Sequence, residues 1–428
     1  MTKSKYVIVG GCAAGIGAVE AIREVDQKGA ITVVSEEQCS HYSRPMISDF
    51  VSGKADLAKM KTRDDDFWQK NYVNTLAGKK AVSLNISEKT VLLESGEKVS
   101  YEKLLIATGG KPYVPKMEGQ DKDGVYTFTN IADAERLSKK INEENSKSAV
   151  VIGAGLIGIS VTEALVKRGI KVTLVELQDK ILSLLLDPKA SDMVEAIVKK
   201  AGVDIITGQS VQKIIGKPDD NNVVGGVLLT KGGTVSCDMV IVAIGVIPRT
   251  ELVAGTAVKT NRGIVVDGYM QTNVPDVYAS GDVAEAYDFV LNQNRLLPLW
   301  PLAVLEGKVA GYNMAGKKTD YSGGTNMSSL KYFGIPIVSI GLASPKEDQS
   351  LETLVMQDEA KGVYKKLVLK DNVVIGITFL GDIERAGTFF YLLKNKVNVT
   401  SFKQTLLADD FSLAALPKEL LNEMKVET

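Results

Sequence analysis

The chain has 428 residues and a formal net charge of −1, with 24% charged and 45% hydrophobic residues. This length allows about two to four domains, and the near-zero charge gives no reason to expect a nucleic acid or an anionic membrane as partner. Three widely spaced cysteines without a CxxC pair and a single histidine, His41, argue against a disulfide framework, a metal site and a histidine-based triad.

Residues 1–36 predict a strand, a turn, a helix and a second strand. KYVIVGG is a continuous apolar run, as expected for a parallel strand buried on both faces. Helical periodicity over residues 13–25 is followed by AITVVSEE, which ends in Glu36. This order predicts a dinucleotide-binding unit in which the helix N-terminus holds a pyrophosphate and Glu36 accepts from ribose hydroxyls. Cys12 stands where a glycine is expected, so it is either a tolerated small residue or a redox group.

The same device returns at SAVVIGAGLIGIS, residues 148–160, with a complete GxGxxG at Gly153, Gly155 and Gly158. A helix and the strand KVTLVE follow, and that strand ends in Glu176. Two complete units are a much stronger signal than one glycine motif. A carboxylate at Glu176 favours a free 2′-hydroxyl, hence NADH over NADPH, although the nearby Lys180 leaves this open.

Three further segments combine a strand with a glycine turn. YEKLLIATGGKPYVP, residues 101–115, and VIVAIGVIPRT, residues 240–250, each place glycine and proline after an apolar strand. PDVYASGDVAEA, residues 275–286, predicts a strand that ends in Ala-Ser-Gly-Asp and then a helix. Asp282 would lie at that helix N-terminus, as an N-cap, as a hydrogen-bond partner of a bound cofactor, or as both.

The last third of the chain predicts one helix and then a separate region. WPLAVLEGKVAGYNMAG, residues 300–316, has a helical pattern. From about residue 321 apolar positions alternate, as in SLKYFGIPIVSIGLA and YKKLVLKDNVVIGITFL, and a closing helix follows.

The ordered motifs GGCAAG, ATGG, GAGLIG, AIGVIP and ASGD resemble those of the flavoprotein pyridine-nucleotide oxidoreductases with the disulfide-reductase fold. Rubredoxin and ferredoxin reductases, small NADH oxidases, coenzyme A-disulfide reductases and the reductase portions of nitrite reductases share that fold. The resemblance implies an α/β protein with two Rossmann-like dinucleotide-binding domains, one for FAD and one for NAD, plus a C-terminal α+β domain. It implies a discontinuous FAD domain at residues 1–115 and 248–320, an NAD(H) domain at 116–247 and an interface domain at 321–428.

The resemblance also implies which residues contact the cofactors. For FAD they are Gly10, Gly11, Cys12, Ala13, Ala14, Gly15, Glu36, Glu37, Arg44, Pro45, Ala107, Thr108, Gly109, Gly281, Asp282 and Trp300. For NAD they are Gly153, Gly155, Leu156, Ile157, Gly158, Glu176 and Gly245. Several members carry a non-glycine residue at the position of Cys12, so the resemblance favours a tolerated small residue over a redox group there.

The segment EEQCSHYSRPMISDF, residues 36–50, departs from the disulfide-reducing members. Alignment on their pattern puts Pro45 where a redox-active cysteine belongs, and Cys39 lies six residues upstream of it. We therefore expect no redox thiol beside the flavin, with Cys39 as a structural cysteine. YSRPMIS instead resembles the rubredoxin-reductase branch, in which Arg44 would reach FAD. Asp49 and Ser160 occupy positions where many members carry a lysine–glutamate pair, and a role for them or for His41 at the flavin stays open.

The resemblance implies that NADH reduces FAD by hydride transfer to N5 and that electrons leave the flavin directly. The expected acceptor is an iron–sulfur protein, ferredoxin-like or rubredoxin-like, or a subunit of a redox complex, and flow could run in either direction. The alternatives are an NADH oxidase that reduces O₂, a disulfide reductase, and a nucleotide-binding assembly or sensor subunit. We expect a cytoplasmic protein without metal, nucleic acid or membrane contacts, and a homodimer stays open.

Overall fold

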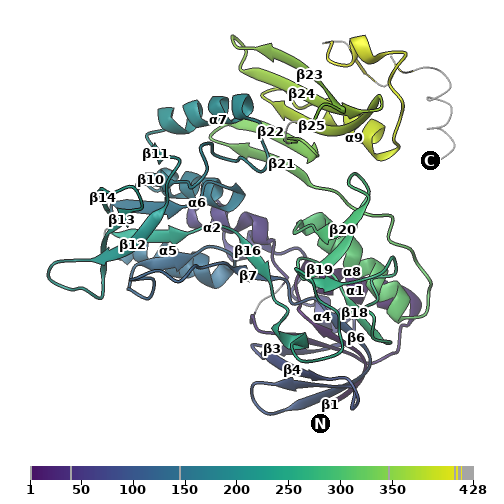
Figure 1. Ribbon diagram of the computed structural model, residues 1–428. Coiled ribbons are helices and arrows are strands. Elements are labelled where there is room, and N and C mark those ends of the chain that lie inside the picture. Colours follow the sequence, from purple (N-terminus) through teal and green to yellow (C-terminus); the bar gives the residue numbers. More distant parts are fainter. Residues whose placement is uncertain are drawn as a thin grey trace. The chain divides into compact units, whose positions relative to one another are not determined.

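The computed structural model describes residues 2–38, 41–143, 146–345, 348–408, 411–412 and 416. The chain forms two compact units, each assembled from separate segments (Figure 1). Unit 1 contains Met1–Pro115, Tyr126–Asn145 and Ile244–Gly324, and unit 2 contains Lys116–Val125, Ser146–Ala243 and Thr325–Thr428.

Unit 1 is built on a mainly parallel sheet. Its strands run in the order β3 (Val73–Ala77), β2 (Ile31–Ser35), β1 (Thr2–Val9), β6 (Lys98–Ile106), β5 (Thr90–Leu93) and β4 (Ala81–Asn85), with β18 (Val277–Ala279) also paired to β6. The strands β3, β2, β1, β6 and β18 run parallel to one another, and β5 and β4 form an antiparallel extension beside β6. Residues of β1, β2 and β6 are buried as the apolar runs predict.

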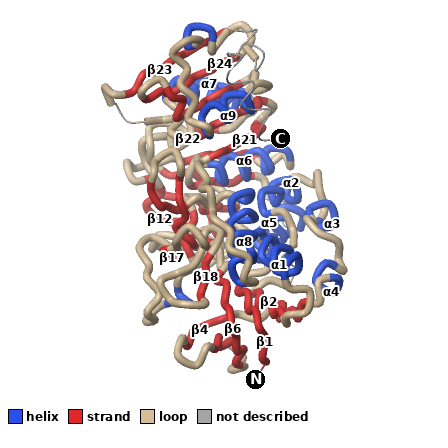
Figure 2. The backbone as a smooth tube through the Cα atoms, turned by 90° about the vertical axis from the view of Figure 1, so that its right-hand side faces the viewer, coloured by secondary structure: helices blue, strands red, loops and turns tan. Residues whose placement is uncertain are grey.

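Two helices of unit 1 lie side by side, α1 (Ala13–Val25) and α8 (Trp300–Met314) (Figure 2). Small residues bring their backbones together, since a Cβ added to Gly307 would lie 2.0 Å from the carbonyl oxygen of Ala14. A Cβ on Gly311 would lie 2.5 Å from the carbonyl oxygen of Ala18. The predicted helices at residues 13–25 and 300–316 are thus confirmed, and α8 also contacts β6 and β18.

The rest of unit 1 consists of one longer helix, α5, and several short elements. The helices are α2 (Ile47–Val51), α3 (Leu57–Met60), α4 (Phe67–Lys70) and α5 (Ile131–Glu143). Strands β7 (Gly110–Pro112) and β16 (Val246–Pro248) form an antiparallel pair, and β17 (Ile264–Val265), β19 (Ala284–Asp288) and β20 (Gln293–Leu296) form a small sheet.

The helix predicted after the ASGD motif is wrong. Gly281 and Asp282 lie in a turn, and the chain continues as strand β19. β19 pairs with β17 and β20, and four of its five residues are buried. The Ser-Gly-Asp sequence looks locally like a helix start, but strand pairing and burial outweigh that weak local preference.

Unit 2 repeats the strand–turn–helix–strand arrangement. Its first sheet has the order β11 (Asp204–Ile206), β10 (Lys171–Val175), β9 (Ser148–Ile152), β15 (Met239–Val242) and β8 (Val125–Thr127). The helices are α6 (Leu156–Lys167), which follows the glycine turn, and α7 (Pro188–Lys200). An antiparallel sheet of β12 (Val211–Gly216), β13 (Val224–Leu229) and β14 (Thr234–Ser236) shares an apolar core with β9 and β15.

The C-terminal region of unit 2 is an antiparallel sheet, as the alternating pattern predicts. Its order is β21 (Met327–Tyr332), β22 (Ile335–Gly341), β25 (Val373–Leu380), β24 (Val363–Lys370) and β23 (Leu351–Asp358). The closing helix α9 (Ala386–Lys394) packs on β25 (Figure 1). This sheet is tied to the α7 N-terminus, because Asp187 accepts from Tyr364 at 3.0 Å and pairs with Lys366 at 3.1 Å.

The contact between α1 and α8 predicts the effect of one added methyl group. Gly307→Ala should lower the stability of the apoprotein by about 1–3 kcal/mol, because the new Cβ strikes a backbone carbonyl that cannot move freely. Gly387→Ala in α9 is the matched control, since nothing lies within 4 Å of its added Cβ. That control should gain about 0.5–1 kcal/mol from reduced backbone entropy. Thermal unfolding followed by circular dichroism measures both changes, and an equal response of the two variants would contradict the close helix contact.

Candidate functional site

The first glycine turn lies between β1 and α1, and its backbone is closely packed. A Cβ on Gly15 would lie 2.0 Å from the carbonyl oxygen of Gly10, and one on Gly10 would lie 2.0 Å from that of Ala107. Gly11 is buried, and Cys12 is the N-cap residue of α1. Among the described residues, the side chain of the N-cap residue makes no capping hydrogen bond to α1, and an uncapped helix N-terminus is the arrangement that binds a pyrophosphate.

The second turn, between β9 and α6, has the same geometry and explains Cys12. A Cβ on Gly158 would lie 1.8 Å from the carbonyl oxygen of Gly153, just as at the first turn. Gly155, which holds the position equivalent to Cys12, has no atom within 4 Å of an added Cβ. The first and third glycines are therefore needed for packing, whereas the middle position is open and admits the side chain of Cys12.

Arg44 lies beside the first turn. Its Nε donates to the sulfur of Cys12 at 3.4 Å, and its Nη1 donates to the carbonyl oxygen of Thr129 at 3.1 Å. The remaining nitrogen is paired with Glu37, whose other oxygen accepts from Tyr42 at 2.7 Å. Glu37 and Arg44, both predicted as FAD contacts, are thus brought together beside the first turn.

The ATGG turn is bound to the returning chain through Arg249. The hydroxyl of Thr108 donates to the carbonyl oxygen of Arg249 at 2.8 Å, and the amide of Arg249 donates to the carbonyl oxygen of Gly109 at 2.9 Å. The guanidinium of Arg249 pairs with Glu36 at the end of β2. Sequence reasoning missed Arg249, although it directly follows the AIGVIP motif.

The ASGD turn supplies a carboxylate that fits a bound hydroxyl group. Within the described part of the chain, no other residue hydrogen-bonds the carboxyl of Asp282, and the buried hydroxyl of Ser280 has no partner there. Burial raises the pKa of Asp282 above its usual value, and the charge of Arg44 opposes that rise. A desolvated acceptor with free hydrogen-bonding capacity suits the ribityl chain of a flavin, so these residues fit FAD.

A small apolar cluster joins these turns. Ala13 and Ala14 at the start of α1 pack with Ala303 of α8, and Ala107 and Trp300 lie against them. A Cβ on Gly281 would lie 3.3 Å from Ala14 and 3.4 Å from Ala303, so the ASGD turn meets the same cluster. The predicted residues of the first turn, the ATGG turn, the ASGD turn and α8 therefore converge in unit 1.

At the second turn, Glu176 holds the loop that follows β9. It accepts from the amide of Ala154 at 2.6 Å and from the amide of Gln178 at 2.8 Å. Lys180 pairs with Asp192 of α7, so it does not offer a free charge for a 2′-phosphate. Leu156 and Ile157 begin α6, and the carbonyl oxygen of Leu156 accepts from Tyr332 at 3.0 Å.

Other residues singled out from the sequence have ordinary surroundings. Gly245 lies in unit 1, where its carbonyl oxygen accepts from the amide of Tyr113 at 3.0 Å. Asp49 pairs with Lys54 at 3.2 Å, and Ser160 lies in α6. His41 lies beside Trp68 and 3.7 Å from Asp65, and Pro45 is exposed in a short 3₁₀ turn, while Cys39 lies outside the described residues.

Glu306 of α8 is a second residue that sequence reasoning missed. Its side chain is 2% exposed and accepts from the amide of Gly281 at 2.8 Å. A single acid between apolar and small residues in LAVLEGKVAG is the signal that could have identified it, because such a position is expected to be buried.

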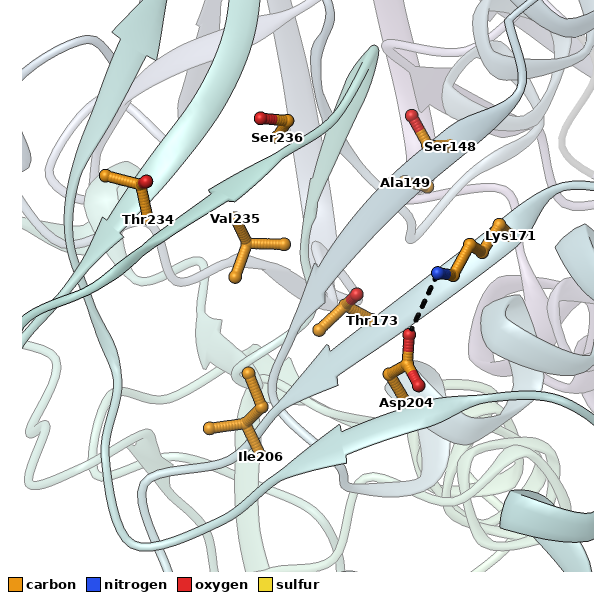
Figure 3. A pocket seen from close by; sticks show the side chains of 9 residues that line it. All are labelled: Ser148, Ala149, Lys171, Thr173, Asp204, Ile206, Thr234, Val235 and Ser236. Carbon is orange, nitrogen blue, oxygen red and sulfur yellow. Dashed lines mark ion pairs between the residues drawn. The ribbon is translucent and has the colours of Figure 1, made fainter.

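A hollow on unit 2 lies away from the glycine turn (Figure 3). It includes Ser148, Lys171 and Asp204, the first residues of β9, β10 and β11, and Lys171 pairs with Asp204 at 3.5 Å. Ligands of such sheets bind at the carboxyl ends of the strands, so this hollow is not the nucleotide site.

Among the described residues, no helix has the length and apolar character to cross a bilayer. The described residues also contain no group of three or more His, Cys, Asp or Glu side chains that could hold a metal ion.

Comparison with known proteins agrees with this geometry. The model of a family described as pyridine nucleotide-disulphide oxidoreductase matches residues 4–307, and that of the rubredoxin NAD+ reductase C-terminal domain matches residues 327–397. The NADH-dependent phenylglyoxylate dehydrogenase subunit epsilon of Aromatoleum evansii is 32% identical over 98% of this chain and 98% of its own length. The rubredoxin-NAD(+) reductase of Pseudomonas putida is 31% identical over 73% of this chain and 80% of its own length.

A solved structure, the water-forming NADH oxidase from Lactobacillus brevis bound to NADH, is 25% identical and superposes with a TM-score of 0.85. The superposition covers 99% of this chain and 98% of the oxidase. These findings confirm the predicted α/β fold, the oxidoreductase class and the cofactors FAD and NAD(H). The chain belongs to the pyridine nucleotide-disulphide oxidoreductase family.

Proposed function

We propose that this chain passes electrons between NADH and an iron–sulfur protein through FAD, without a thiol relay. Pro45 carries the proposal, because it stands where the resemblance expects a redox cysteine and has no nucleophile to offer. When bound, FAD accepts a hydride from NADH and can release electrons one at a time. A one-electron carrier is the natural acceptor for a flavin that has no thiol beside it.

Neither of the two cysteines that the structure describes readily loses its proton to form a thiolate. Burial raises the pKa of Cys12 above its usual value, and the adjacent Arg44 only partly opposes this. Burial in the apolar core of unit 2 raises the pKa of Cys237 to about 12. Both thiols are therefore protonated at neutral pH, which supports a structural role for each.

The assignment of the two nucleotides rests on the turns. In unit 1, the α1 N-terminus would hold the pyrophosphate of FAD, and Asp282 would accept a hydrogen bond from its ribityl chain. Arg44 and Glu36 would contact its adenosine moiety. In unit 2, the turn around Gly155 would hold the NADH pyrophosphate, and Glu176 would accept from the adenosine ribose. The remaining predicted contacts, and the division of the chain into FAD, NAD(H) and C-terminal interface domains, belong to the same proposal.

The relatives support two kinds of partner. The Pseudomonas putida relative is named for rubredoxin, which supports a small iron–sulfur acceptor. The Aromatoleum evansii relative is named as a subunit of an NADH-dependent dehydrogenase and aligns over nearly its whole length. That likeness supports a variant of the proposed function in which NADH and FAD act as described, but the iron–sulfur partner is another subunit of a redox complex.

Rapid anaerobic mixing of the FAD-loaded protein with NADH tests the proposed function. We expect fast bleaching of the flavin and fast recovery only when ferredoxin or rubredoxin is added. Fast recovery in air without either protein would indicate an NADH oxidase instead. Absence of bleaching would leave a nucleotide-binding assembly or sensor subunit.

The preference for NADH should depend on Glu176 and not on Lys180. Glu176→Gln removes the charge that repels a 2′-phosphate, and we expect the ratio of kcat/KM for NADH over NADPH to fall about tenfold, or about 1.4 kcal/mol. Lys180→Ala is the matched control and should leave the ratio unchanged, because Lys180 is paired with Asp192. A larger effect of the Lys180 change would mean that its charge reaches the nucleotide.

Thiol labelling tests the electrostatic argument about the cysteines. In a Cys39→Ser variant, Ellman's reagent should modify the folded protein slowly at about pH 7 and faster as the pH rises, because raised pKa values keep the thiolate fraction below the few per cent of a free cysteine. Both remaining thiols should react at once after unfolding. A folded-state thiol that reacts at pH 7 as fast as in the unfolded chain would restore Cys12 as a redox candidate.

A further inference from the structure

Glu306 is a buried acid with two hydrogen bonds and no cation beside it. One oxygen accepts from the amide of Gly281 at 2.8 Å, and the other lies 3.3 Å from the hydroxyl of Tyr321. No Lys, Arg or His of the described chain forms an ion pair with it. Burial of a charged carboxylate without a cation costs desolvation free energy, so an acid at this position calls for a structural or functional explanation.

Burial and the charge of Asp282 favour the neutral form of Glu306, and they outweigh the hydrogen bonds from Gly281 and Tyr321, which favour the charged form. Asp282 follows the bonded glycine, and its negative charge opposes a second one, while burial contributes most. Tyr321 is itself buried and holds its proton, because burial and Glu306 raise its pKa. The acids of the packed helix α1, Glu20 and Glu24, contact Lys308 and Tyr312 and not Glu306.

We propose that Glu306 is a positioning residue that holds the Gly281–Asp282 turn in place for the flavin. Its hydrogen bond fixes the backbone of Gly281, and the next side chain along is the carboxyl assigned to the ribityl chain. The α1–α8 contact places Glu306 there, because Gly307 lies directly against Ala14. This inference rests on the proposed assignment of unit 1 to FAD.

The positioning depends on protonation. Burial raises the pKa of Glu306 to about 8, so at neutral pH it carries a proton. Above that pKa a second negative charge develops beside Asp282 and disfavours the geometry of the turn. The folded apoprotein binds this proton more tightly than the unfolded chain, so this group's contribution to stability declines as the pH rises from about 4.5 to about 8.

FAD binding to the apoprotein, followed by quenching of free flavin fluorescence, tests the proposal without any turnover. The wild-type Kd should rise at least about threefold between about pH 7 and about pH 9. Glu306→Gln keeps an acceptor for the Gly281 amide, so its Kd should stay within about threefold of wild type at pH 7 and should lack the rise. Glu306→Ala leaves that amide without its buried acceptor, so its Kd should rise about tenfold or more at pH 7.

Glu285→Gln is the matched control. Glu285 is 6% exposed and accepts from the amide of Gly263 at 2.7 Å, so it makes the same kind of bond away from the ASGD backbone. It should keep the wild-type Kd and pH dependence. Identical pH curves for wild type and Glu306→Gln would overturn the protonation argument, even if Glu306→Ala does not fold.

The two proposals fail in different ways. An Ala variant that folds and binds FAD as tightly as wild type would overturn the positioning role and leave the proposed function intact. A wild-type protein that binds FAD but is not reduced by NADH would overturn the proposed function and leave the role of Glu306 standing. A wild-type apoprotein that binds no FAD would remove the basis of both.

Discussion

The backbone contact between α1 and α8 is the constraint on which the candidate flavin site depends. Small residues at Ala14, Gly307 and Gly311 let the two helices touch where side chains would normally separate them. The N-terminus of α1 carries the first glycine turn, and the N-terminus of α8 carries Trp300. Because the helices are in contact, these ends and the ASGD turn meet around one cluster of alanines.

Electrostatics then divides the site into two parts. Near the first turn, Arg44 and Glu37 form a paired network that also fixes Cys12. Near the ASGD turn, Asp282 and Glu306 are acids whose pKa values burial raises, without an ion-pair partner in the described chain. Paired charge suits the phosphate and adenosine side of a dinucleotide, whereas unpaired, desolvated acceptors suit hydroxyl groups.

The open middle position of the glycine turn shows how a motif can vary without loss of its chemistry. In both units the third glycine lies against the carbonyl oxygen of the first, which excludes a Cβ at the third position, and the first glycine has a positive φ. The middle position has no such contact in the second unit, and the first unit fills it with a thiol held by Arg44. These glycine turns therefore contain positions at which backbone packing excludes a side chain and one position at which it does not.

The sequence by itself determined the two strand–turn–helix–strand units, the helices at α1 and α8 and the C-terminal sheet, because apolar periodicity and glycine turns are local signals. It also determined the family, through the order of five motifs. The tertiary structure decided the rest: that a strand and not a helix follows Asp282, that Lys180 is occupied by Asp192, and that Arg249 and Glu306 reach the turns. Those outcomes depend on strand pairing, ion pairs and burial between residues that are distant in the chain. These interactions contribute more free energy than the local secondary-structure preferences of the sequence.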